Sequence, residues 1–138
     1  MKKALILIFA ALMIPSVALA AKPSHPGKPA PQVTYVLKGT LSNYAPYDSV
    51  TPANGSITIV VKRAMPHGKS LKGATLTFPI DAKTKIKLRH HMTTITDGDR
   101  GIIMVRAAKH IAPADLAATL QASSAKRIVD QGAPKPKH

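Results

Sequence analysis

Residues 74–92 of the chain read ATLTFPIDAKTKIKLRHHM, and apolar side chains recur at every second position in both halves of this stretch. A period of two sends alternate side chains to opposite faces of a strand, so that one face is buried and the other is solvated. The stretch therefore predicts two half-buried strands. The inward residues are Leu76, Phe78 and Ile80 in the first strand, and Ile86, Leu88 and Met92 in the second.

The same alternation extends to both sides of this stretch. It recurs at residues 33–41 and 56–62, and less regularly at residues 101–107. Because β-branched and aromatic residues occupy the inward positions, these runs also indicate strands. We expect the following residues to be buried in the core: Leu37, Ile59, Phe78, Leu88 and Val105.

Residues 116–130 allow two interpretations. Pro113 could start a helix that places Leu116 and Leu120 on one face. Several residues of this segment, Ser123 among them, are mediocre helix formers. We therefore favour a closing strand that is bulged near Ser123, and a helix is the alternative.

Five or six short strands predict an all-β domain. We expect a small OB-like antiparallel barrel over residues 33–131, since closure removes exposed sheet edges. Four prolines fall within residues 22–31, so residues 21–32 are predicted to form a Pro-rich disordered linker, and residues 132–138 a basic disordered tail. The chain contains no cysteine, so the domain must rely on its core without disulfides.

The first 20 residues are typical of a signal peptide. A positively charged start and an apolar run at residues 4–14 precede the small residues Ala18 and Ala20. The run is too short to span a bilayer, which needs roughly 20 residues. We expect cleavage between Ala20 and Ala21, no transmembrane segment after cleavage, and a secreted protein or one located in the periplasm or cell envelope. An uncleaved anchor is the alternative.

The order of short motifs is similar to that of a known family. The motifs are KGTL (38–41), GSITI (55–59), ATLTF (74–78), TKI (84–86) and GDR (98–100). This order resembles a family of uncharacterised OB-like domains in exported bacterial proteins, over roughly residues 33–130. The resemblance implies a small OB-like β-barrel and implies no catalytic residue.

The chain is strongly basic. Twenty Lys and Arg face six acidic residues, all of them Asp, and the formal net charge is +14. Loss of Lys2 and Lys3 with the signal peptide lowers this charge to +12. Such a charge raises the local concentration of polyanions. We expect anionic partners such as cell-wall polymer, lipopolysaccharide or nucleic acid.

Basic residues occupy alternate positions of the predicted strand at 83–92. They are Lys83, Lys85, Lys87, Arg89 and His91. Same-face neighbours on a strand lie about 6.6 Å apart, so these five residues would form a cationic ridge of roughly 26 Å. The ridge predicts a polyanion-binding site. A solubilising face whose lysines discourage edge pairing is the alternative.

Two further surfaces are candidate interaction sites. Ile102 and Met104 are apolar residues on the expected outer face of their strand, and they indicate an alternative function as a protein-interaction or self-association face. Tyr44 and Tyr47 lie in the expected connection after residue 41, where aromatic rings can line the ligand face of an OB-like barrel. Packing over a barrel end is the alternative for these two tyrosines.

The sequence carries no catalytic signature. It has no Cys, no Glu, no Gly-x-Ser-x-Gly elbow and no phosphate-binding glycine loop. His90 and His91 are adjacent, so on a strand they point to opposite faces and cannot bind one metal ion together unless the strand ends before them. Asp97-Gly98-Asp99 lacks the further ligands of a calcium loop and is interpreted as a turn. We expect a non-catalytic protein without cofactor or metal.

Overall fold

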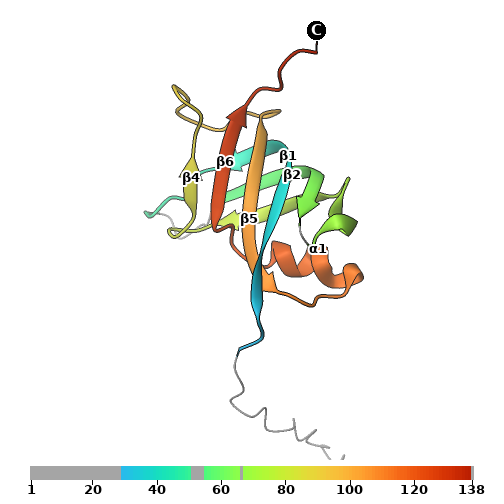
Figure 1. Ribbon diagram of the computed structural model, residues 1–138. Helices are drawn as coiled ribbons and strands as arrows, with labels where there is room; N and C mark the ends of the chain where they lie inside the picture. The colour runs from blue at the N-terminus through green and yellow to red at the C-terminus, as the bar shows by residue number, and fades with distance from the viewer. Residues whose placement is uncertain (1–28, 51–54, 66, 138) are drawn as a thin grey trace, which may run out of the picture.

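A computed structural model describes residues 29–50, 55–65 and 67–137. The expected signal peptide, its cleavage site and most of the expected linker lie outside these residues. The described chain forms six strands, a 3-10 helix and one α-helix (Figure 1). The elements are β1 (Gln32–Ala45), β2 (Gly55–Met65), η1 (Lys69–Leu71), β3 (Thr75–Ile80), β4 (Lys85–Lys87), β5 (Arg100–Ala108), α1 (Pro113–Gln121) and β6 (Arg127–Gly132). No helix in these described ranges is long and apolar enough to cross a membrane.

The six strands form one curled sheet, a half-barrel, in the order β3-β2-β1-β5-β6-β4. The predicted all-β, barrel-like fold is confirmed. One pairing differs from the fully antiparallel barrel that we expected, because β4 and β6 run parallel. A parallel pair requires a crossover connection, and here β5 and α1 supply it.

The curl of the sheet depends on β1, the longest strand. Its first part pairs with β5 through Gln32–Thr40, and its later part pairs with β2 from Val36 to Ala45. The register with β2 shifts between Lys38 and Gly39. A Cβ atom at Gly39 would collide with the Val60 carbonyl, so glycine is needed where the two strands approach most closely.

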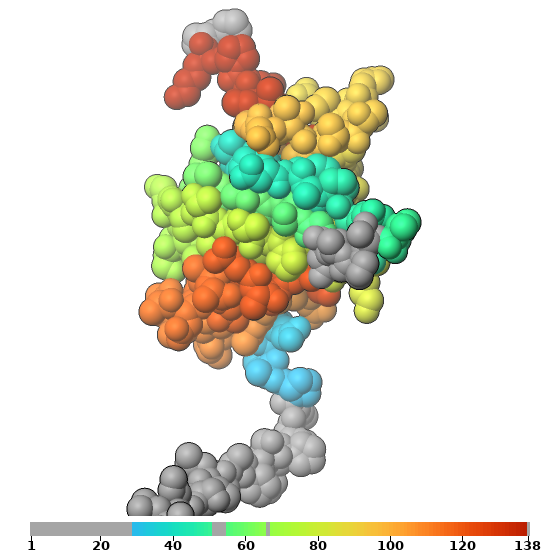
Figure 2. All heavy atoms as spheres, turned by 180° about the vertical axis from the view of Figure 1, so that it is seen from behind, coloured from blue at the N-terminus to red at the C-terminus, as the bar shows by residue number. Residues whose placement is uncertain are grey.

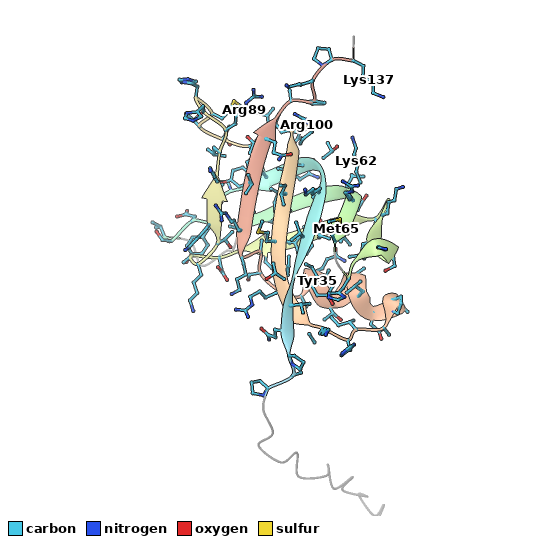
Figure 3. All side chains as sticks on the ribbon, viewed as in Figure 1. Tyr35, Lys62, Met65, Arg89, Arg100 and Lys137 are labelled. Atoms are coloured by element: carbon cyan, nitrogen blue, oxygen red, sulfur yellow. The ribbon has the colours of Figure 1, made fainter. Side chains whose placement is uncertain are left out.

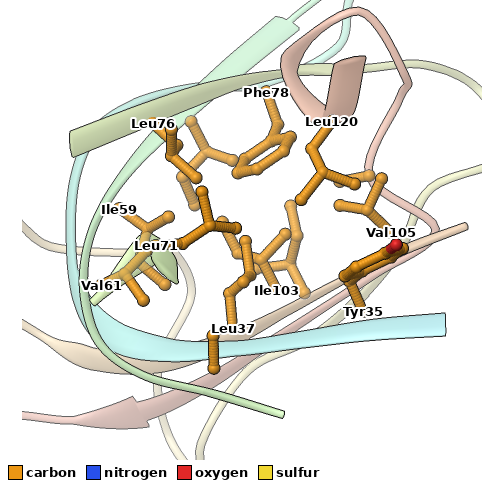
Figure 4. Packing of buried hydrophobic residues seen from close by; sticks show 14 of the residues in the cluster. Tyr35, Leu37, Ile59, Val61, Leu71, Leu76, Phe78, Ile103, Val105 and Leu120 are labelled. Carbon is orange, nitrogen blue, oxygen red and sulfur yellow. The ribbon is translucent and has the colours of Figure 1, made fainter. Parts of the chain in front are cut away.

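The core lies on the concave face of the sheet (Figure 4). Phe78 of β3 is fully buried there, opposite side chains from β1 and β5. The predicted burial of Leu37, Ile59, Phe78 and Val105 is confirmed. Leu88 is only half-buried, since β4 ends one residue before it, and this prediction is wrong.

The closing strand that we favoured over residues 116–130 is a wrong prediction for the first half of this segment. The α1 helix occupies 113–121, and the last strand, β6, begins only at Arg127. Leu116 and Leu120 are buried in the core, so tertiary packing compensates for the weak helix propensity of this segment. Figure 2 shows the molecule from behind, where α1 lies below β3, and α1 also contacts β5 and η1.

The segment after α1 brings the two ends of the sheet together. The Ala125 N–H donates to the Pro79 carbonyl of β3 (3.1 Å), and the Lys85 N–H of β4 donates to the Lys126 carbonyl (3.0 Å). The Gln121 side chain also accepts a hydrogen bond from the Thr77 N–H, at 3.0 Å. The outer edge of β3 is therefore covered, whereas the outer edge of β4 pairs with no described strand.

Candidate functional site

The predicted basic strand is much shorter than expected. β4 contains only three residues, with Lys85 and Lys87 exposed and Ile86 packed against the core. It is the last strand of the sheet, and in the described part of the chain no strand pairs with its other edge. The prediction of one straight strand over residues 83–92 is wrong, so the five basic residues do not form a continuous ridge.

Lys83 lies in the turn that precedes β4. Its backbone N–H donates to Asp81 Oδ1 at 2.8 Å, and the Asp81 N–H donates to Thr84 Oγ1 at 3.1 Å. Hydrogen bonds from the Ser124 side chain and from the Lys83 N–H hold the pKa of Asp81 below its usual range. The Lys83 side chain is exposed on this turn and is not part of β4.

The chain leaves the sheet after β4, which separates Arg89 and His91 from the two lysines. His91 adopts a φ of 68° within a turn, a left-handed conformation that interrupts any extended strand. Arg89 packs against Gly132, with its Nη1 atom 3.5 Å from the Gln131 carbonyl. Arg89 therefore lies beside the end of β6 (Figure 3).

Two neighbouring cavities, of about 620 and 310 Å³, are both lined by Arg89 and His90. The smaller one also reaches Asp130, which our sequence analysis did not single out. Asp130 is 3% exposed, and its Oδ1 atom accepts the Gly132 N–H at 2.8 Å. Its Oδ2 atom has no hydrogen-bond partner among the described residues. Within those same residues, no group of three or more His and Asp side chains is placed to hold a metal ion.

The predicted turn at residues 97–99 is confirmed. Asp97 Oδ1 accepts the Asn43 N–H at 2.8 Å, and Asp99 Oδ2 accepts the Thr96 N–H at 3.1 Å. Gly98 adopts a φ of 94°, which favours glycine. Both carboxylates thus bind backbone groups of the turn and of the end of β1.

The two tyrosines occupy different environments. β1 extends further than expected, to Ala45, so Tyr44 belongs to this strand and packs against the core. Tyr47 lies beyond the strand and is 37% exposed. Tyr44 therefore covers an end of the half-barrel, and the two rings do not share one loop.

The register of the sheet joins two surfaces that the sequence analysis treated separately. Residues that pair directly across a sheet point to the same face, and two rows of paired residues cross the convex side from β2 to β4. The first row is Met65, Val36, Met104, Arg127 and Lys85. The second row is Arg63, Lys38, Ile102, Val129 and Lys87. We call these ten residues the outer face.

The outer face is apolar in its middle and cationic at both sides. The middle belongs to β1, β5 and β6, and its half-buried residues are Val36, Ile102, Met104 and Val129. Met65, which is 52% exposed, extends the apolar part onto β2. The five remaining residues are exposed cations, and neither row contains an acidic residue. Figure 3 labels Met65 on the β2 side of this surface.

Four of these ten residues were predicted from the sequence, Lys85 and Lys87 as part of the basic strand and Ile102 and Met104 as the apolar alternative. Lys38, Arg63 and Arg127 were not predicted as part of this face. Lys38 lies in the alternating run 33–41, Arg63 directly after the run 56–62, and Arg127 in the segment 116–130. Their grouping depends on the pairing register, which a single sequence does not specify. The sequence signals that could have pointed to these residues were their positive charge and their positions in or next to predicted strands.

No family model, curated protein or solved structure matches this chain. The geometry and charge of the outer face are therefore the basis for a proposed function.

Proposed function

We propose that this protein is an exported, non-catalytic barrel that binds anionic polymers of the cell envelope through its outer face. The observation that carries the proposal is the pair of residue rows, which together hold five exposed cations and no acid. The formal net charge of +14 adds a long-range attraction for polyanions.

The spacing of the cations supports this ligand class. Neighbouring strands lie about 4.8 Å apart, and same-face residues along a strand about 6.6 Å apart. Lys38 and Arg63 stand on one side of the apolar middle, and the three cations of β6 and β4 stand on the other. A polymer with charged groups at intervals of several ångströms can therefore contact both sides. Such binding releases counterions, so its affinity falls steeply as salt concentration rises.

The apolar middle supports a second candidate, a protein-interaction or self-association face centred on Ile102 and Met104. Self-association through this surface would bring two sets of five cations together, and like charges across an interface are unfavourable. The charge therefore favours an anionic partner over a second copy of the chain. An apolar protein contact would also be far less sensitive to salt.

The test is salt elution from immobilised heparin with two double variants of equal charge. Lys85→Glu/Lys87→Glu changes the outer face, whereas Lys109→Glu/Lys137→Glu changes exposed residues beyond β5 and in the C-terminal segment. We expect the first variant to elute at clearly lower salt than the second. The slope of log affinity against log salt is negative, and its magnitude should decrease by about 2, roughly one for each lost contact.

Equal elution of the two variants would contradict the proposal, because it would mean that binding depends only on net charge. Retention that is insensitive to salt and lost in Met104→Asp would favour the protein-interaction face instead.

A further inference from the structure

A second cationic feature, separate from β4, surrounds a cavity of about 370 Å³ between β2 and η1. Four of the six residues that line this cavity are cations. The lining residues are Lys62, Arg63, Ala64, Met65, Lys69 and Lys72. Figure 3 labels Lys62 and Met65, on the side of the sheet opposite Arg89. The cavity adjoins the outer face at Arg63 and Met65, and its three lysines lie outside that face.

A bulge in β2 supplies two of the four cations. Lys38 of β1 pairs with Arg63 and Gly39 pairs with Val61, so Lys62 has no partner in the ladder. In a regular strand, successive side chains point to opposite faces. Here both Lys62 and Arg63 are exposed, because the bulge turns the extra residue outward.

The turn that contains η1 holds the other two cations beside the bulge. Leu71 anchors the turn, since its side chain is buried in the core. Val61 makes two backbone hydrogen bonds to the turn, donating to the Ala74 carbonyl at 2.9 Å and accepting the Gly73 N–H at 2.7 Å. The backbone that carries Lys69 and Lys72 is therefore fixed to β2, and the cavity wall is formed before any ligand arrives.

These four charges are not neutralised within the described structure. No acidic side chain lines the cavity, and the charged side-chain groups of the four cations have no hydrogen-bond or ion-pair partner among the described residues. The Debye length at 0.1 M salt is about 10 Å, so charges around a cavity of this size are poorly screened from one another. These like charges repel one another, and an anion at the centre of the cavity would relieve that repulsion.

We propose that this cavity binds a small anion that carries two or three linked phosphoryl groups. Its volume lies at the lower end of the range typical of small-molecule sites. Four cations match the charge of a diphosphate or triphosphate, and Arg63 offers the planar fork that binds phosphate oxygens in pairs. The phosphoryl chemistry is the same whether the groups belong to a free polyphosphate or to a lipid headgroup.

The experiment is calorimetric titration of the purified protein with tripolyphosphate at low ionic strength, with vesicles containing a polyprenyl diphosphate lipid as a second arm. The test variant is Lys69→Glu/Lys72→Glu, which leaves the outer face unchanged. Lys109→Glu/Lys137→Glu is the control of equal charge. We expect the test variant to lose roughly tenfold or more in affinity and the control to lose much less.

Saturable binding of tripolyphosphate that is lost only in the test variant supports a free ligand. Binding to vesicles alone, lost in the same variant, supports a phosphorylated headgroup. Absence of binding in both arms, or equal loss in the two variants, overturns the site. Should the test variant fail to fold by circular dichroism, Lys69→Gln/Lys72→Gln replaces it. Because Lys85 and Lys87 are unchanged throughout, this result is independent of the heparin test of the outer face.

Discussion

The concave and convex faces of the same sheet are built from adjacent residues yet obey different constraints. On β5, Ile103 is fully buried on the concave face, whereas its neighbour Met104 is half-exposed on the outer face. On β2, Ile59 is fully buried and Val60 is 38% exposed. Folding requires only the first member of each pair to be apolar, so the composition of the outer face is free to serve binding.

Adjacent substitutions on β5 test this difference directly. Ile103→Ala should lower the free energy of unfolding by about 2–5 kcal/mol, because it leaves a cavity in the core. Met104→Ala should lower it by only about 1 kcal/mol, since half of the side chain already contacts solvent. Chemical denaturation of the two variants measures both values. Equal losses would show that the outer face is covered by protein and is not an accessible surface.

The alternation of apolar residues predicted most of the core on the concave face, with Leu88 as an exception. Leu37, Ile59 and Phe78 lie on strands whose period of two is regular, and burial on one side fixes such a period. The α1 helix was only the alternative interpretation, because it is nine residues long and depends on Leu116 and Leu120 contacting the core. Short helices gain most of their stability from tertiary packing, which local propensity does not contain.

The outer face could be predicted only in fragments. The basic alternation continues through Arg89 and His91, but His91 adopts a left-handed conformation and the strand ends at Lys87. The grouping of Lys87 with Ile102 requires β6 to lie between β4 and β5. The chain reaches β6 only through the crossover that contains α1. We had favoured a strand over this helix.

A smaller effect on stability is expected at the turn between β3 and β4, where Asp81 lies. The pKa of Asp81 is lowered from its ordinary value of about 3.8, chiefly by the hydrogen bond from Ser124. The ionised form therefore stabilises the folded state above roughly pH 4, and this stabilisation is lost as the pH falls through the lowered pKa. Asp81→Asn should destabilise the protein at neutral pH, with a deficit relative to the wild type that shrinks in acid.

Urea denaturation at a series of pH values measures this deficit. Asp115→Asn, at an exposed position in the first turn of α1, controls for the loss of one negative charge. A deficit that stays constant from neutral pH into strong acid would show that the Asp81 carboxylate does not couple folding to protonation.

The smallest effect on stability, and the sharpest test of the lysines, is expected at the free edge of β4. Lys85→Val/Lys87→Val should change the free energy of unfolding by no more than about 0.5 kcal/mol, because both side chains are exposed. The variant would nevertheless present an apolar run at residues 85–88, three of them β-branched, on an edge that no described strand pairs with, and we expect it to self-associate in light scattering. Lys109→Val/Lys137→Val is the control and should remain dispersed.

The valine and glutamate variants separate two roles of Lys85 and Lys87, namely anion binding and protection of the β4 edge against pairing. Glutamate keeps a charge on the edge but repels anions, so Lys85→Glu/Lys87→Glu should stay dispersed and lose heparin binding. Valine removes the charge, so its variant should lose both properties if the lysines have both roles. Dispersed valine variants with weakened heparin binding would assign the lysines to the ligand alone. The opposite outcome is self-association of the valine variant with unchanged heparin binding by the glutamate variant. It would assign Lys85 and Lys87 to edge protection alone, because a charge of either sign at the edge would then be sufficient.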